Sequence, residues 1–171
     1  RSNVPILLVA PSNLAVDVAL EQFVGQLEQF GPQEWLRERR VLRYGYPQKT
    51  SILDREELLG PPEQGELSRE ISRISRAIKQ AAREESPEEK LATLRTELLN
   101  AQEQLRLLVR EHLRSCVLVA TTTTQAYMES SPIHEIGWDT VMVDEVTMVP
   151  PAVCLYLSHL ATRRFLLAGD P

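Results

Sequence analysis

The sequence predicts an α/β fold in which helices cover both faces of a parallel sheet and an antiparallel helical hairpin is inserted midway. Three observations lead to it: short apolar runs, helical patterns between them, and two long amphipathic stretches in the centre. The runs that we expect to be strands are residues 6–10, 41–44, 116–120, 141–143 and 165–168. They are continuous rather than alternating, which is typical of parallel strands buried on both faces. Arg43 interrupts the second run, which is the weakest.

Helical periodicity follows the first run and precedes the last. After the first run, apolar residues recur at steps of four and three and so share one helical face. They are Val16, Leu20, Phe23, Leu27 and Phe30. Ser12 or Asn13 can cap the start of this helix, and Gly31-Pro32 stops it. Pro150-Pro151 opens a shorter helix before the last run. Strands and helices in alternation predict a parallel sheet.

The centre of the chain has a different pattern. Residues 67–81 and 91–108 each carry apolar side chains at steps of four and three, and the acidic stretch 84–89 separates them. Two amphipathic helices joined by a short turn predict an antiparallel hairpin. The Pro- and Gly-containing segment 60–65 is its hinge. The predicted organisation is therefore residues 1–59 and 115–171 as two parts of one α/β domain, with 60–114 as the inserted hairpin.

Composition limits the classes of function. The chain has 171 residues and a net charge of -5, which argues against coating of nucleic acid by bulk charge but leaves a local groove open. Cys116 and Cys154 lie in apolar runs without metal-ligand spacing, so we expect two buried free thiols in a reducing compartment. No apolar run reaches the ~18 residues of a membrane span. We expect an intracellular protein, cytoplasmic or, in a eukaryote, nuclear. The start at Arg1 and the end at Pro171 suggest a fragment.

Polar residues follow four of the predicted strands. These segments are Pro11-Ser12-Asn13, Thr121 to Thr124, Asp144-Glu145 and Gly169-Asp170. In open α/β sheets, ligands bind beyond the carboxyl ends of the strands. Four such segments at one edge indicate a binding site there. Taken singly, each has a plainer interpretation: a helix cap, a polar turn into a helix, an acidic turn, and a glycine turn.

Two adjacent acids at the tip of an apolar strand form a Walker B arrangement. Asp144 can hold Mg²⁺, which takes one or two carboxylates and keeps several waters. Glu145 can orient and deprotonate an attacking water, because phosphoryl transfer depends mainly on positioning and charge stabilisation. The matching phosphate loop, G-x-x-x-x-G-K-[ST], is absent from the sequence. Gly60 and Gly65 have its glycine spacing, but Glu66 and Leu67 stand where Lys and Ser or Thr belong.

The order of these segments resembles the first motor domain of the up-frameshift-like superfamily 1 helicases. Residues 10–17 (APSNLAVD) resemble motif Ia, and residues 41–47 (VLRYGYP) resemble the arginine-x-glycine-histidine-proline segment that follows it. Residues 118–122 (LVATT) are similar to motif Ic, 143–145 (VDE) to motif II, and 166–171 (LLAGDP) to the start of motif III. The hairpin stands where members of this branch insert a helical subdomain.

The resemblance implies an incomplete RecA-like domain from an enzyme that uses ATP and Mg²⁺ to move along single-stranded DNA or RNA, usually from 5′ to 3′. By that resemblance Asp144 holds Mg²⁺ and Glu145 activates water, while Gly169 and Asp170 belong to the nucleotide site and couple it to movement. The residues that it places along the bound strand are Pro11, Ser12, Asn13, Thr121 and Thr122. Without the phosphate loop, the chain alone is expected to be inactive.

The sequence also departs from the family. Val146, Thr147 and Met148 follow motif II where alanine, a small residue and glutamine are usual, and Tyr46 replaces the histidine. These departures keep a second class open, a noncatalytic module that binds nucleic acid or protein. A third class, a metal-dependent nuclease built on Asp144 and Glu145, lacks the additional ligands of a two-metal site nearby in sequence. We also expect a protein partner on the hairpin. A further expectation is self-association of the chain through an unprotected edge of the sheet.

Overall fold

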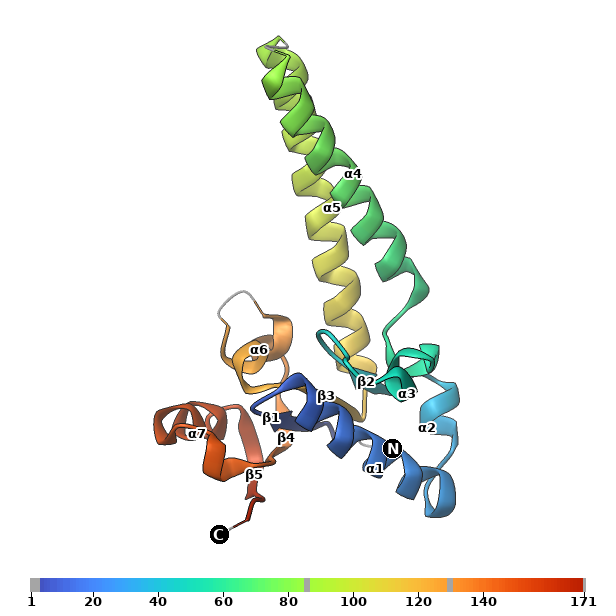
Figure 1. Cartoon of the computed structure of the whole chain (residues 1–171), viewed down its shortest axis with the longest axis vertical. Coiled ribbons are helices and arrows are strands. Elements are labelled where there is room, and N and C mark those ends of the chain that lie inside the picture. Colours follow the sequence, from blue (N-terminus) through green and yellow to red (C-terminus); the bar gives the residue numbers. More distant parts are fainter. Residues whose placement is uncertain (1–3, 85–86, 129–130, 171) are drawn as a thin grey trace. The chain divides into compact units, whose positions relative to one another are not determined.

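The computed structural model describes residues 4–84, 87–128 and 131–170, and it has an α/β architecture with a five-stranded, all-parallel sheet (Figure 1). The strand order is β2-β3-β1-β4-β5. The strands are β1 (Ile6–Ala10), β2 (Val41–Arg43), β3 (Leu118–Thr122), β4 (Trp138–Val143) and β5 (Ala161–Leu167). All five predicted strands are present, so the predicted parallel α/β sheet is confirmed. β4 and β5 begin earlier than predicted, and β3 is shifted toward Thr122.

Both faces of the central strands are covered. Helix α1 (Asn13–Phe30) packs on the face that carries Leu8 and Leu118, in one cluster of buried side chains. The alternate residues on the other face, among them Leu7 and Val119, are buried as well. Helix α6 (Thr123–Tyr127) contacts β1 and β3, and α7 (Pro151–Ser158) contacts β4 and β5. This double burial explains why the strands read as continuous apolar runs.

Short elements complete the α/β body. Helices α2 (Glu34–Arg37) and α3 (Thr50–Leu53) flank β2, and single turns of 3-10 helix follow. These turns occupy Glu56–Leu58, Pro132–Glu135 and Val146–Met148.

Two expectations about burial are wrong. Phe30, predicted to share the inner face of its helix, is 76% exposed, because the buried stripe of α1 runs through Val16, Leu20, Val24 and Leu27 instead. β5 is not a buried strand, since Leu166 and Leu167 are 46% and 55% exposed. It lies at the edge of the sheet, and within the described part of the chain it pairs with β4 alone. An edge strand has a neighbour on one side only, so an apolar sequence does not guarantee its burial.

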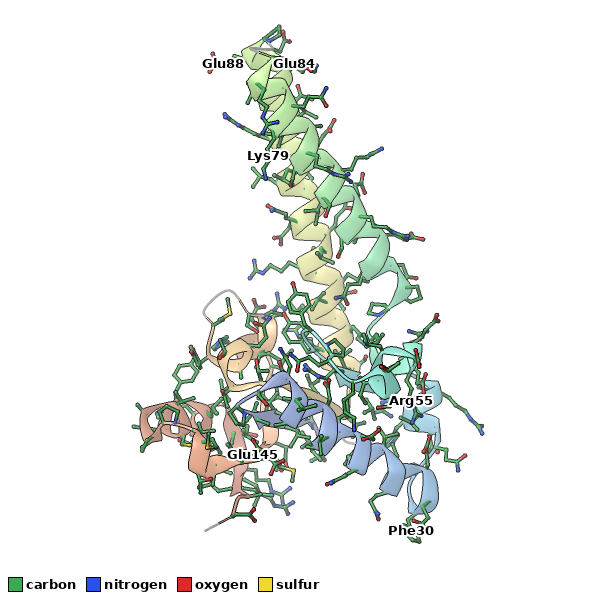
Figure 2. All side chains as sticks on the ribbon, in the orientation of Figure 1. Phe30, Arg55, Lys79, Glu84, Glu88 and Glu145 are labelled. Atoms are coloured by element: carbon green, nitrogen blue, oxygen red, sulfur yellow. The ribbon has the colours of Figure 1, made fainter. Side chains whose placement is uncertain are left out.

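The chain divides into two compact units, Arg1–Gly60 with His112–Pro171 and Pro61–Glu111. The second unit consists mainly of two long helices, α4 (Pro62–Arg83) and α5 (Glu88–Ser115), which lie side by side in Figure 1. Figure 2 places Glu84 and Glu88 together at one end, as expected for an antiparallel pair. Glu85 and Ser86 of the predicted turn lie outside the described residues. Among the described residues, no helix combines the length and the apolar character needed to cross a membrane.

The two cysteines differ in their surroundings, which yields a first prediction. Cys116 is fully buried, and burial raises the pKa of its thiol to about 12. Cys154 is only half-buried, so the expectation of two buried thiols is wrong for this residue. Because the thiolate is the reactive form, an alkylating reagent at mildly alkaline pH is expected to modify Cys154 in the folded protein and Cys116 only after unfolding. Mass spectrometry of labelled peptides measures this order. Rapid labelling of the folded Cys154→Ser variant would contradict it.

Candidate nucleotide and nucleic-acid site

The carboxyl ends of the five strands lie at one edge of the sheet. Ala10 is in register with Thr122, Val9 with Val143, and Val143 with Leu167. Because the strands are parallel, the polar segments that follow them form one continuous edge. Across the sheet their order is the segment after β2, Thr122, Ser12-Asn13, Asp144-Glu145 and Gly169-Asp170.

Ser12 caps helix α1. It has extended backbone angles (φ -129°, ψ 158°), and its Oγ accepts a hydrogen bond of 3.1 Å from the backbone N–H of Ala15. Of the two predicted caps, Ser12 therefore has this role. Asn13 uses its side chain differently, since its Oδ1 accepts a 2.9 Å hydrogen bond from Nη2 of Arg43. Ser12 is exposed, while Pro11 and Asn13 are half-buried.

A buried ion pair joins α1 to the end of β2. Nε of Arg43 donates to Oδ1 of Asp17 at 2.6 Å, and both side chains have no exposed surface. The other carboxylate oxygen of Asp17 accepts the backbone N–H groups of Gln48 at 2.6 Å and Lys49 at 2.9 Å. A buried charge pair is stable only when its remaining hydrogen-bonding groups are satisfied, and this pair meets that condition through the backbone.

The same ion pair fixes the loop that follows β2. Arg43 donates to the backbone carbonyl of Tyr44 at 2.7 Å and to that of Tyr46 at 3.4 Å. Gly45 between them has φ +109°, a backbone conformation that residues with a side chain rarely adopt. The side chain of Tyr46 is 83% exposed. The loop thus presents an aromatic ring to solvent from a backbone that is held in place.

The sequence pattern alone does not identify Tyr46 or Arg43 as part of this site. In the sequence, Tyr46 is a departure from a family motif and Arg43 is an interruption of an apolar strand. A signal was present, because opposite charges stood inside two otherwise apolar patterns, at Asp17 and Arg43. Two such charges can be buried only as partners.

The threonines after β3 differ in access. Thr122 is half-buried and caps α6, since its Oγ1 accepts from the backbone N–H of Gln125 at 3.2 Å. Thr121 is fully buried, and its Oγ1 has no hydrogen-bond partner among the described residues. Thr121 and Thr122 are the two threonines expected to contact a bound nucleic-acid strand. Of these two, only Thr122 is accessible in this structure.

Tyr44 also lies at this end of β2, and its phenol is half-buried. Burial raises the pKa of Tyr44 above its ordinary value, against the opposing effect of hydrogen bonds with Ser131 and Gln125. The phenol therefore stays neutral over the whole physiological range.

The acids after β4 have unusual local geometry. Asp144 is half-buried, and its backbone N–H donates to Val9 at 2.8 Å, which continues the pairing of β4 with β1. Glu145 is exposed and left-handed, with φ 50° and ψ 41°. This conformation costs a non-glycine residue on the order of 1–2 kcal/mol, and such strain is concentrated at functional sites. A turn of 3-10 helix follows, in which Met148 is exposed.

The structure brings the predicted segment after β5 against these acids. The backbone N–H of Ala168 donates to the carbonyl of Val143 at 2.8 Å. The backbone N–H of Val146 donates to the carbonyl of Ala168 at 2.9 Å. A Cβ atom on Gly169 would lie 3.1 Å from the backbone nitrogen of Val146. Only glycine therefore fits here without a shift. Asp170 is exposed, and Pro171 lies outside the described residues.

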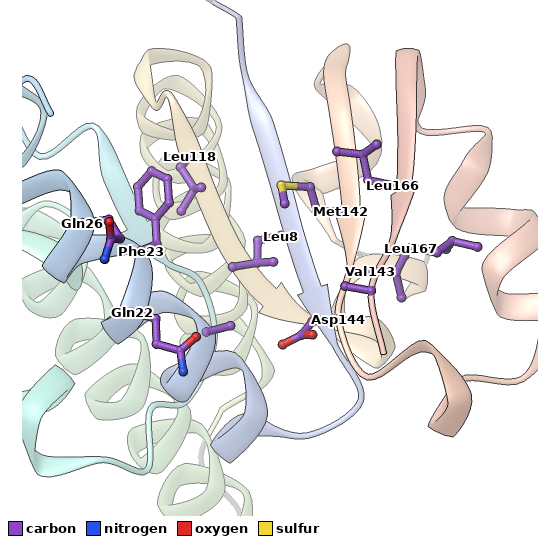
Figure 3. A pocket seen from close by; sticks show the side chains of 12 residues that line it. Leu8, Gln22, Phe23, Gln26, Leu118, Met142, Val143, Asp144, Leu166 and Leu167 are labelled. Carbon is purple, nitrogen blue, oxygen red and sulfur yellow. The ribbon is translucent and has the colours of Figure 1, made fainter. Parts of the chain in front are cut away.

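A pocket of about 320 Å³ opens on the α1 face of the sheet beside Asp144 (Figure 3). Its lining is mostly apolar, with Leu8, Met142 and Leu166 from the strands and Phe23 from α1. Figure 3 shows the Asp144 carboxylate at the end of the pocket, with Gln22 of α1 across from it.

The acids at this edge suit Mg²⁺ as partial ligands. Across residues 4–84, 87–128 and 131–170, no three His, Cys, Asp or Glu side chains gather as metal ligands. Asp144 and Glu145 offer two carboxylates at an accessible edge, which fits a cation that binds through one or two carboxylates and retains its waters. It does not fit a site in which the protein alone supplies every ligand.

A scan against protein-family models finds no match to this chain, and a search of curated proteins finds no significant match.

Proposed function

We propose that this chain is part of the first RecA-like motor domain of an ATP-dependent nucleic-acid helicase of the up-frameshift-like superfamily 1 branch. The observation that carries the proposal is the contact between the segment after β5 and the acids after β4. Gly169 lies against the backbone of Val146, at the same sheet edge as Ser12 and Thr122. One edge thus combines an acidic part and a polar, accessible part. This is the arrangement that coupling of nucleotide to nucleic acid requires.

In the acidic part, Asp144 would hold Mg²⁺, which when bound neutralises phosphate charge. Glu145 would accept a proton from the attacking water and hold that water in line with the phosphate. Its exposed position leaves room for a water and a nucleotide. Gly169 and Asp170 would transmit a change at these acids to the part that binds nucleic acid, because the backbone of Gly169 lies against Glu145 and Val146.

The polar part would contact a single strand. The hydroxyl of Ser12, the exposed start of α1 and Thr122 are suited to phosphate and sugar contacts. Tyr46 adds an exposed ring on a held loop, which is suited to stacking on an unpaired base. We include Tyr46 in the site on this ground.

A second candidate function is a noncatalytic module that binds nucleic acid or protein. Met148 favours it, because this exposed thioether stands where the family carries glutamine and cannot donate a hydrogen bond to a nucleotide. ATP hydrolysis by the complete protein, with and without single-stranded DNA or RNA, separates the two. Hydrolysis stimulated by one nucleic acid supports the motor, and no hydrolysis under any condition supports the module.

Tyr46→Ala is expected to weaken single-strand binding by about 5- to 150-fold, because stacking on one base contributes about 1–3 kcal/mol. Tyr46→Phe keeps the ring and should bind as the unchanged chain does. Phe30→Ala is the matched control, since Phe30 is equally exposed but lies at the far end of α1, away from the site. Fluorescence anisotropy with a labelled oligonucleotide measures the three affinities. An equal loss in Tyr46→Ala and Phe30→Ala, or no loss in either, contradicts the stacking role.

A further inference from the structure

Helix α4 carries a stripe of positive charge. The segment from residue 69 to 83 holds five cations and one acid, although the whole chain has a net charge of -5. The cationic stripe consists of Arg69, Arg73, Arg76, Lys79 and Arg83, and all five side chains are exposed. Figure 2 labels Lys79, which marks the position of the stripe on the hairpin.

The periodicity of the helix gathers these charges. At 3.6 residues per turn, the five cations fall within about a third of the circumference of α4. The glutamates of the helix, Glu63, Glu66 and Glu70, fall outside that arc. The apolar side chains lie opposite it, and among them Ile74 is buried. The stripe is therefore uninterrupted by acids and points away from the face that packs within the hairpin.

Local contacts leave the charges available to a partner. Arg73 approaches Glu70 at 3.8 Å, but both are largely exposed, and a pair of this kind contributes little. Nε of Arg76 donates to the carbonyl of Ser72 at 3.2 Å, an exposed contact with an uncharged group that leaves the charge of Arg76 without an acidic partner in that bond. Ser68, Arg69, Ser72, Arg73 and Arg76 line a shallow hollow on this face.

We propose that the cationic stripe binds the phosphodiester backbone of a nucleic-acid duplex. Four of its five cations are arginine, whose planar guanidinium group makes bidentate contacts with phosphate. From Arg69 to Arg83 the stripe extends about 21 Å along a straight axis. A regular row of cations on a rigid helix matches a rigid row of phosphates.

The absence of aromatic residues from α4 favours a duplex over a single strand as the ligand of the stripe. α4 contains no Phe, Tyr, Trp or His. Proteins that bind single strands depend on aromatic stacking, whereas duplex binding that ignores sequence depends on phosphate contacts alone. The site goes beyond the proposed function, which places a single strand at the sheet edge of the other unit. It does not require ATP.

The test compares two triple variants of the full chain that remove the same charge. One variant changes the stripe (Arg69→Gln, Arg73→Gln, Arg76→Gln). The control changes three exposed cations of α5 that have acids close by in sequence (Lys90→Gln, Arg95→Gln, Arg106→Gln). Glutamine preserves helix propensity, and circular dichroism checks that each variant is folded. Anisotropy with labelled DNA duplex, RNA duplex and single strand is measured over a range of salt concentrations.

The stripe variant is expected to bind duplex at least about tenfold more weakly at low salt. The slope of log affinity against log salt should fall by about 2.7, for three lost phosphate contacts on B-form DNA. The control should bind as the unchanged chain does. A larger loss for DNA than for RNA duplex, or the reverse, identifies the natural duplex.

Three results would overturn the proposal. Equal losses in the two variants would mean general charge attraction. Unchanged duplex binding in the stripe variant would mean that the stripe takes no part. A loss of binding to polyglutamate as large as the loss for duplex would assign the stripe to an acidic protein surface instead. Since Tyr46→Ala probes the single-strand site separately, failure of either proposal leaves the other measurable.

Discussion

Replacing Arg43 with alanine is expected to lower the free energy of unfolding by about 3–5 kcal/mol, the usual effect of removing one partner from a buried ion pair. Asp17 would remain buried without its ion-pair partner, and two backbone carbonyls of the loop after β2 would lose a donor. Denaturant unfolding followed by circular dichroism measures the change.

Arg163→Ala serves as the control for this prediction. Arg163 also lies on a strand and is 3.7 Å from an acid, Asp139, but its side chain is exposed. Its loss should change stability by less than about 1 kcal/mol. Similar values for the two variants would contradict the structural importance of the buried pair.

A double replacement examines the reason for the effect. In other proteins, exchanging a whole buried ion pair for apolar residues can be neutral. Here Asp17 also accepts two backbone N–H groups, so Asp17→Leu with Arg43→Met would leave those donors unsatisfied. We expect the double variant to remain destabilised. Full recovery of stability would show that the backbone contacts of the pair are dispensable.

Glu145→Gln is expected to reduce ATP hydrolysis by the complete protein by about 10²–10⁴-fold while ATP binding is retained, because only the group that accepts the proton of the water is lost. Glutamine has nearly the same shape, so the left-handed backbone of this position is under similar strain in both forms. Steady-state phosphate release and nucleotide binding are measured in parallel.

Glu97→Gln, an exposed acid on α5, is the control for this change and should leave hydrolysis unaltered. If the Glu145→Gln variant hydrolyses ATP at the normal rate, another group is the base and the proposed role of Glu145 is wrong. If the unchanged protein itself has no hydrolysis, the noncatalytic module replaces the motor.

The strands and the caps could be predicted from sequence because they depend on local properties. Continuous apolar runs identified β1 and β4, and Ser12 stood at the cap position of α1. The polar segments follow the carboxyl ends of parallel strands, so their position at one edge of the sheet could be predicted as well. These features require no knowledge of which strand lies beside which.

The remaining features depend on distant parts of the chain. Exposure of Leu166 is decided by the edge position of β5, which its own sequence does not contain. The pairing of Asp17 with Arg43 joins residues 26 positions apart and depends on where β2 enters the sheet. The left-handed backbone of Glu145 is likewise imposed by the turn between β4 and β5, since glutamate has no local preference for it.

The position of the helical insertion has a consequence for how far this segment can be altered. The unit Pro61–Glu111 comes between β2 and β3 in the sequence. These two strands are immediate neighbours in the sheet. A connection between neighbouring strands can lengthen, shorten or be exchanged at small entropic cost and without altering strand order. A change in the charge or the length of the hairpin is therefore expected to leave the order of the five strands unaltered.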